Sequence, residues 1–163
     1  MLLGNLPPLT KNRTCAFTGH RILKEDFSFS DLKEDILKIY NLGYDIFLCG
    51  MAKGFDLACF EAVLDLKKEH NDINICAVIP CSDQAKYFSV EDKIKYNSFL
   101  KQADFTVSEE KTYYKNCMLK RNEFLVNNSS LLYAYFNGEK KGGTYYTISL
   151  AKKNQIEIVY YGK

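Results

Sequence analysis

The sequence lacks any C-x-x-C pair and holds only two histidines, His20 and His70, although six of its 163 residues are cysteines. A tetrahedral zinc site would have to be assembled from scattered cysteines, so we expect no structural metal. Cys15, Cys49 and Cys76 lie inside apolar segments, where a cysteine behaves as a small hydrophobic residue. These features predict reduced thiols in a cytoplasmic protein.

Long apolar runs are also absent, because none approaches the ~20 residues that are needed to span a bilayer. The N-terminal segment MLLGNLPPLTKNR has no basic region followed by an apolar one, so we expect no secretory signal. The net charge is only +2, and the 22 basic and 20 acidic residues are interspersed. This charge pattern disfavours a dedicated nucleic-acid binder.

The two common phosphate-binding fingerprints, G-x-G-x-x-G and G-x-x-x-x-G-K-[ST], do not occur, which disfavours NAD-linked redox chemistry and P-loop ATP hydrolysis. A different glycine segment is present. The apolar run 131–136 is long enough for a buried strand, and Lys141-Gly142-Gly143-Thr144 follows it directly before a helix-compatible segment. A strand, a glycine loop with a lysine and a helix start can bind phosphate. The same order is also typical of an ordinary strand-to-helix turn.

Apolar strand-like runs alternate with helical patterns along the chain, which predicts a parallel sheet covered on both faces. Residues 1–13, which contain Pro7-Pro8, are expected to form a lead-in, and residues 14–163 a single α/β domain. Helix caps are predicted at Ser30 or Asp31, at Asp56 and at Ser89. The predicted strands are 14–18, 44–49, 73–79, 103–107, 131–136 and 156–160, and the predicted helices begin near 31, 56, 89, 115 and 144.

Glycine, threonine and basic residues recur directly after several of the predicted strands. Because ligands of an open parallel sheet bind beyond the carboxyl ends of its strands, these glycine, threonine and basic residues are expected to meet at one rim. The convergence favours an anion site. The candidate ligand-binding residues at the strand ends are Thr18, Gly19, His20, Arg21, Gly50, Met51, Gly54, Lys141, Gly142, Gly143 and Thr144.

Five side chains have more than one interpretation. Arg121 lies on a partly apolar helix face, where it needs either a carboxylate partner or a phosphate or ribose of a ligand. His20 could bind phosphate or transfer a proton, although a lone loop histidine is more often neither. Asp56 is interpreted first as a helix cap, and second as a carboxylate that could bind a ribose hydroxyl. Tyr145 and Tyr146 could stack on a base, but core packing is the commoner use.

Five segments in sequence order carry a resemblance to a known family: FTGHR at 17–21, GMAKGFDLA at 50–58, Pro80 with Gln84, MLKRN at 118–122 and KGGT at 141–144. Together they closely resemble the YpsA-like family of the SLOG superfamily, which also contains the lonely-guy phosphoribohydrolases and DNA-processing protein A. The resemblance implies a Rossmann-like three-layer sandwich with a mostly parallel sheet of five to six strands. It also implies a pocket for a nucleotide or a nucleotide-derived ligand.

The lonely-guy enzymes carry a Met-x-x-Arg-Lys helix, which the segment 118–121 fits, with Asn122 in place of the lysine. Their Pro-Gly-Gly-x-Gly-Thr-x-x-Glu loop is shortened here: Lys141 replaces the proline, and Ile148-Ser149 follow where the glutamate should fall. Cleavage of a glycosidic bond requires a carboxylate near the ribose, so this loss speaks against the same reaction. Glu61 or Glu123 could substitute if either reached the pocket.

The sequence therefore favours binding or sensing of a nucleotide-derived ligand, with no resident cofactor and no metal. The alternative is a hydrolase of nucleotide N-glycosidic bonds, and single-stranded DNA binding is the least favoured of the three. The expected partner is a small molecule rather than a membrane or a nucleic acid. Catalytic residues are not assigned, and a homo-oligomer is left open.

Overall fold

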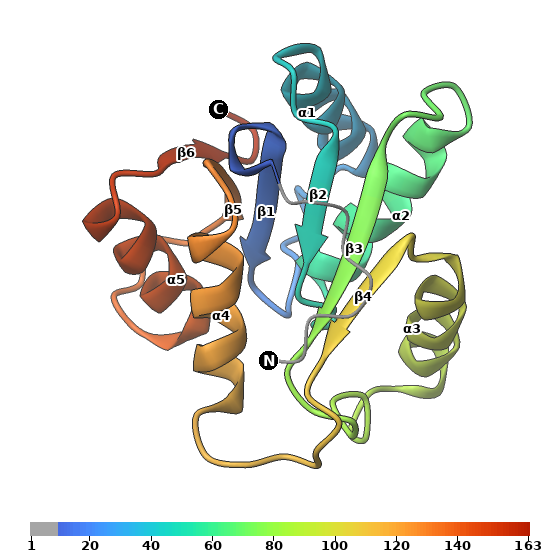
Figure 1. Cartoon of the computed structure of the whole chain (residues 1–163), viewed down its shortest axis with the longest axis vertical. Helices are drawn as coiled ribbons and strands as arrows, with labels where there is room; N and C mark the ends of the chain where they lie inside the picture. Colours follow the sequence, from blue (N-terminus) through green and yellow to red (C-terminus); the bar gives the residue numbers. More distant parts are fainter. Residues whose placement is uncertain (1–9) are drawn as a thin grey trace.

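The computed structural model describes residues 10–163 and contains one six-stranded parallel sheet (Figure 1). The order of the strands is β4-β3-β2-β1-β5-β6. The chain therefore adds β2, β3 and β4 on one side of β1, and β5 and β6 on the other. The strands are β1 (Thr14–Gly19), β2 (Ile46–Cys49), β3 (Asn74–Ile79), β4 (Phe105–Ser108), β5 (Leu131–Tyr135) and β6 (Glu157–Tyr160).

Helices cover both faces of the sheet, and successive residues of the central strand show why. Phe17 of β1 packs in the cluster that holds the buried residues of α1, α2 and α3, whereas Ala16 packs in the cluster of α4 and α5. Strands buried on both faces need apolar residues at consecutive positions. The predicted Rossmann-like three-layer sandwich is thus confirmed. Its helices are α1 (Phe29–Asn41), α2 (Phe55–Lys67), α3 (Val90–Gln102), α4 (Cys117–Asn127) and α5 (Gly142–Lys153).

Two of the predicted helix caps are wrong, and both helices begin one to three residues earlier than expected. The cap of α1 is Ser28, whose hydroxyl accepts a hydrogen bond from the Asp31 N–H at 3.2 Å. The cap of α2 is Gly54, because the chain turns there with a φ of 82° that favours glycine. The cap of α3 at Ser89 is confirmed, since its hydroxyl accepts from the Asp92 N–H at 3.1 Å.

The predicted lead-in lies mostly outside the described residues, including Pro7-Pro8. Its described end forms one turn of 3₁₀-helix, η1 (Lys11–Arg13), and Arg13 is ion-paired with Asp45 before β2. In residues 10–163 no helix is both long and apolar enough to cross a membrane. All six cysteines lie in this part of the chain, and all are buried with unpaired thiols.

Candidate functional site

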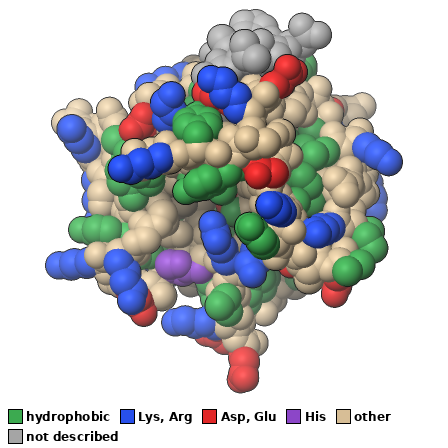
Figure 2. Space-filling model, turned by 90° about the horizontal axis from the view of Figure 1, so that it is seen from below, with side chains coloured by type: hydrophobic (Ala, Val, Ile, Leu, Met, Phe, Trp, Pro, Cys, Tyr) green, Lys and Arg blue, Asp and Glu red, His purple; other side chains and the backbone are tan. Residues whose placement is uncertain are grey.

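A cleft of about 530 Å³ opens at the carboxyl ends of the strands, where β1 and β5 lie side by side. The order of strand addition reverses at this point, which is where ligands of doubly wound sheets bind. Figure 2 views the molecule from this edge and shows lysine and arginine side chains spread over this face, with acidic side chains among them. The cleft brings together most of the predicted site: Thr18, Gly19, His20, Arg21, Asp56, Arg121, Lys141, Gly142, Gly143 and Thr144.

Three predicted residues, Gly50, Met51 and Gly54, are not among those that line the cleft. Protein atoms occupy the space that the two glycines leave. A Cβ at Gly50 would lie 2.6 Å from Nη1 of Arg121, and one at Gly54 would collide with the carbonyl oxygen of Arg21. Met51 is fully buried in the core. In this loop, glycine therefore allows the chain to pack against itself.

The glycine segment forms the first turn of α5 at one wall of the cleft. Lys141 is the cap residue, and Gly142 has a φ of 88° that favours glycine. The first N–H groups of a helix have no partner within it, and they carry the positive end of the helix dipole. Thr144 is buried at the same end, while the ammonium group of Lys141 is exposed and lies 3.3 Å from Glu139. This wall can therefore accept an anion.

Asp56, in the first turn of α2, is the acidic residue of the cleft lining and is only 5% exposed. Its Oδ2 accepts a hydrogen bond from the Ala52 N–H at 3.2 Å, whereas its Oδ1 is buried with no hydrogen-bond partner. Burial raises the pKa of Asp56 to about 6, although the nearby Arg121 opposes this shift. A buried carboxylate oxygen without a donor is costly, so Oδ1 is an unsatisfied acceptor on a residue that lines the cleft.

Arg121 of α4 is 6% exposed and reaches across the end of the sheet to β2. Its guanidinium donates one hydrogen bond to the Gly50 carbonyl and another, from Nε, to Oδ1 of Asn122 at 2.8 Å. Burial lowers the pKa of Arg121, while Asp56 counteracts this effect. The two bonds use two of the five N–H donors of a guanidinium. Arg121 is thus fixed in place with donors remaining toward the cleft that it lines.

His20 lies in the cleft wall, but one of its ring nitrogens already has a partner. Nε2 accepts a hydrogen bond from the Asn137 N–H at 3.0 Å, and the ring stacks on Phe136 with centroids 5.9 Å apart. Burial lowers the pKa of His20 below its ordinary value. These contacts hold the loop after β5 against the end of β1, so His20 positions the site through Nε2.

Sequence reasoning missed several lining residues, including Lys24, Tyr135 and Asn137. Asn137 comes directly after a predicted strand, so the strand-end argument could have included it. Lys24 carried no signal, because it lies five residues beyond β1 in an irregular loop. Neither Tyr145 nor Tyr146 lines the cleft: the Tyr145 ring stacks on Phe136, with centroids 6.3 Å apart.

A parallel sheet with helices on both faces, a glycine helix start and buried polar groups at the switch point defines a Rossmann-like domain of the doubly wound class. A model of the YpsA family, described as the YspA SLOG family, matches residues 24–161. The chain belongs to this family, and the predicted resemblance is confirmed.

Two relatives illustrate the match in sequence. A UPF0398 protein of Halalkalibacterium halodurans is 30% identical over 130 residues, which cover 78% of this chain and 69% of that protein. The UPF0398 protein YpsA of Bacillus subtilis is 24% identical over 160 residues, which cover 91% of this chain and 89% of the relative.

Solved structures of DNA processing protein A share the fold. The Streptococcus pneumoniae protein superposes with a TM-score of 0.66 and 16% identity, and covers 93% of this chain. This chain spans about half (51%) of that protein. The Helicobacter pylori protein is described for its single-stranded DNA binding mode, and it superposes with a TM-score of 0.68 and 18% identity. The match covers 97% of this chain and 69% of the Helicobacter pylori chain. At these identities the likeness concerns the fold alone.

Proposed function

We propose that the cleft between β1 and β5 binds a nucleotide or a nucleotide-derived ligand. One observation carries the proposal: Asp56, whose Oδ1 is buried without a donor, lines the same cleft as the first turn of α5 and several basic side chains. A site for a simple anion would not be expected to include a buried carboxylate, because the two negative charges repel each other. A ligand that combines a phosphate with sugar hydroxyls matches both groups.

The phosphate is placed at the first turn of α5. Backbone N–H groups of Gly142, Gly143 and Thr144 are the donors of this turn, and the helix dipole adds to their attraction for an anion. Arg21 is exposed on the opposite loop and lines the same cleft, so it supplies charge from the other side. A guanidinium suits bidentate contact with phosphate oxygens.

The sugar is placed toward Asp56, whose carboxylate oxygen accepts a hydrogen bond from a ribose hydroxyl. A hydrogen bond to a charged group contributes about 1.5–3 kcal/mol. Because Oδ1 is buried, the Asp56 side chain has to turn toward the cleft for a ligand hydroxyl to reach this oxygen. Asp56 would therefore select ligands that carry a free hydroxyl over inorganic phosphate.

Calorimetric titration with adenosine monophosphate tests the proposal. We expect binding by the wild-type protein, about tenfold weaker binding by Asp56→Asn, and a comparable loss for Arg21→Ala. Asp26→Asn is the matched control. Asp26 is an exposed aspartate in the segment between β1 and α1, which also carries Arg21, and it does not line the cleft. Absence of binding by adenosine, guanosine, cytidine and uridine monophosphates alike would refute the proposed function.

Cleavage of the N-glycosidic bond is a second candidate, favoured by the pKa of about 6 at Asp56. A carboxyl group that titrates near neutral pH suits proton transfer at a ribose. The glutamates considered earlier are less suitable, because Glu61 and Glu123 do not line the cleft and Glu123 accepts a hydrogen bond from Tyr146 at 2.9 Å. Chromatography of the monophosphate after incubation tests this candidate, since release of the free base is its required product.

Binding of single-stranded DNA is a third candidate, suggested by the Helicobacter pylori protein and by the basic side chains on this face (Figure 2). The overall net charge of +2 does not describe this one face, so it is weak grounds against nucleic acid. An oligodeoxythymidine titration at two salt concentrations tests it, because phosphate contacts make affinity fall steeply with salt.

A further inference from the structure

A second cavity of about 500 Å³ adjoins the cleft on the side of β2 and β3. Its walls are the loops after β3 and β4, which are joined by a hydrogen bond of 2.7 Å from the Ser82 N–H to the Lys111 carbonyl. The two cavities share Arg21, Ala52, Met118 and Arg121 as lining residues. Both arginines therefore stand at the junction, and a ligand in the cleft can extend past them.

The second cavity has a different chemical character from the cleft. Tyr87, Phe88 and Tyr113 contribute three aromatic rings to its lining. Tyr87 is 87% exposed and Tyr113 is 64% exposed. The Lys86 ammonium lies over the Tyr87 ring, 5.4 Å from its centroid. Large aromatic side chains on an exposed surface are well suited to stacking on a planar group such as a nucleobase.

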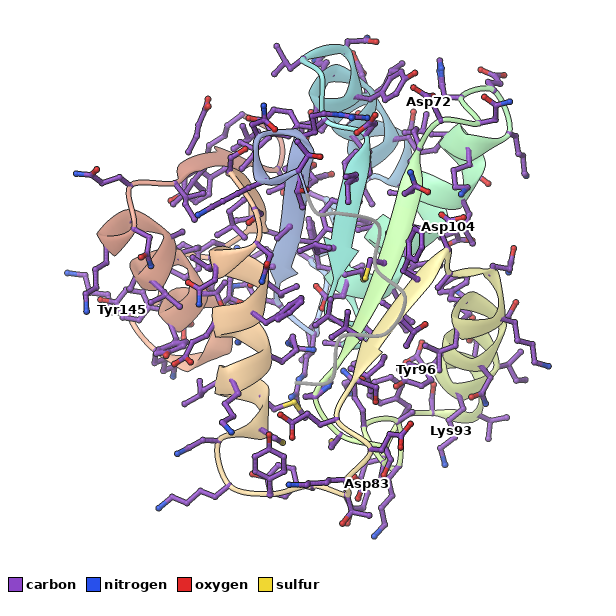
Figure 3. The ribbon with its side chains drawn as sticks, viewed as in Figure 1. Asp72, Asp83, Lys93, Tyr96, Asp104 and Tyr145 are labelled. Atoms are coloured by element: carbon purple, nitrogen blue, oxygen red, sulfur yellow. The ribbon has the colours of Figure 1, made fainter. Side chains whose placement is uncertain are left out.

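The loops that carry these rings are fixed by hydrogen bonds. Oδ1 of Asp83 accepts from the Tyr113 N–H at 2.8 Å, which sets the backbone at the mouth. Gln84 donates to the Gly50 carbonyl at 2.8 Å and accepts from the Tyr96 hydroxyl at 3.0 Å. Figure 3 shows Tyr96 on α3 and Asp83 in the loop below it, near the same lower edge of the sheet. The cavity is thus held open before any ligand enters.

We propose that the second cavity binds the second base of a dinucleotide whose bridging phosphates run from the first turn of α5 to Arg21 and Arg121. This inference rests on the proposed function and extends it, because it names a dinucleotide rather than a mononucleotide as the preferred ligand. The two cavities are similar in volume, as the two halves of such a ligand require. The paired guanidinium groups at the junction suit the charge of a pyrophosphate.

A series of three ligands separates the contributions of the first nucleotide, the second sugar and the second base to the affinity. Affinities of the wild-type protein are measured for adenosine monophosphate, ADP-ribose and diadenosine diphosphate at one salt concentration. We expect diadenosine diphosphate to bind about tenfold more tightly than ADP-ribose, because only the former carries a second base for stacking. Equal affinity for these two ligands would overturn the inference, while binding of the monophosphate would leave the proposed function intact. Failure of all three to bind would overturn the inference, whereas the proposed function would fall only if guanosine, cytidine and uridine monophosphates also failed to bind.

Variants locate the second base. Tyr113→Ala and Tyr87→Ala remove exposed rings, so the fold should persist, and each should reduce the preference for diadenosine diphosphate over ADP-ribose several-fold. Their affinity for the monophosphate should stay at the wild-type value. Leu42→Ala is the control. Leu42 is 71% exposed, but it follows α1 at the amino ends of the strands, away from the cavity. An unchanged preference in both tyrosine variants, or tighter binding of oligodeoxythymidine than of the dinucleotide, would contradict the inference.

Discussion

Replacing Asp56 with asparagine should make the protein more stable at neutral pH and a weaker binder at the same time. The amide oxygen that this substitution introduces can still accept the hydrogen bond from the Ala52 N–H. What the variant loses is a buried negative charge. Because one pKa unit corresponds to about 1.4 kcal/mol, a rise from 3.8 to about 6 means that ionised Asp56 destabilises the fold by about 3 kcal/mol.

The sign of the pH dependence follows from proton binding. The folded chain holds the Asp56 proton to a higher pH than the unfolded chain does, so this group's contribution favours folding below about pH 4 and is lost as the pH rises through about 6. The free-energy difference between Asp56→Asn and wild type should therefore be near zero at about pH 4 and reach about 3 kcal/mol at about pH 7.5. Comparing the two proteins cancels the titration of His20, which both contain.

Urea unfolding followed by circular dichroism measures this difference, since the chain has no tryptophan for fluorescence. Asp26→Asn should show no comparable pH-dependent difference from wild type. A stability difference that stays constant with pH would mean that Asp56 is not the titrating group. A variant less stable than wild type at neutral pH would mean that attraction to Arg121 outweighs the cost of burial. Either result would refute the reasoning.

Three further predictions concern local geometry. Gly54→Ala should destabilise the fold by at least about 2 kcal/mol in urea unfolding, because its Cβ would collide with the Arg21 carbonyl at a positive φ; a smaller loss would mean that the loop can shift. Ser89→Ala should cost about 1 kcal/mol in the same assay by removing the cap of α3, and an unchanged midpoint would show that the cap is dispensable. Burial lowers the pKa of His20, so its contribution to the free energy of unfolding is lost as the pH falls below about 6.5. His20→Gln should therefore lose less stability than wild type between neutral and acidic pH in the same assay. An equal loss in both proteins would show that other groups cause it.

The order and type of the five α-helices and six strands in residues 10–163 followed from the sequence, because apolar runs mark the strands and helical spacing marks the segments between them. The short 3₁₀-helix η1 did not follow. The starts of α1 and α2 did not follow. Ser28, Ser30 and Asp31 are all residues that can cap a helix, and only packing selects among them. At α2, the close approach of Gly54 to the Arg21 carbonyl decides the start, and sequence spacing does not reveal a contact between two loops.

The candidate site was predictable to the extent that it lies at strand ends. Arg21 and Thr144 were placed correctly at one rim, since parallel strands bring their carboxyl ends together. The role of Gly50 and Gly54 could not be predicted. A sequence does not show whether the space beside a glycine holds a ligand or another part of the chain, such as Arg121. The second cavity was also missed, since Tyr113 belongs to an irregular loop whose position depends on its bond to Asp83.

The burial of all six thiols gives the chain a practical property. A thiol-reactive dye should leave the native protein unlabelled, so one introduced cysteine would carry the label without a cysteine-free background. Ile22 is 81% exposed and lines the cleft, which makes Ile22→Cys a reporter at the entrance to the site. A change in dye emission on adding each nucleotide would then provide a direct optical screen for the natural ligand.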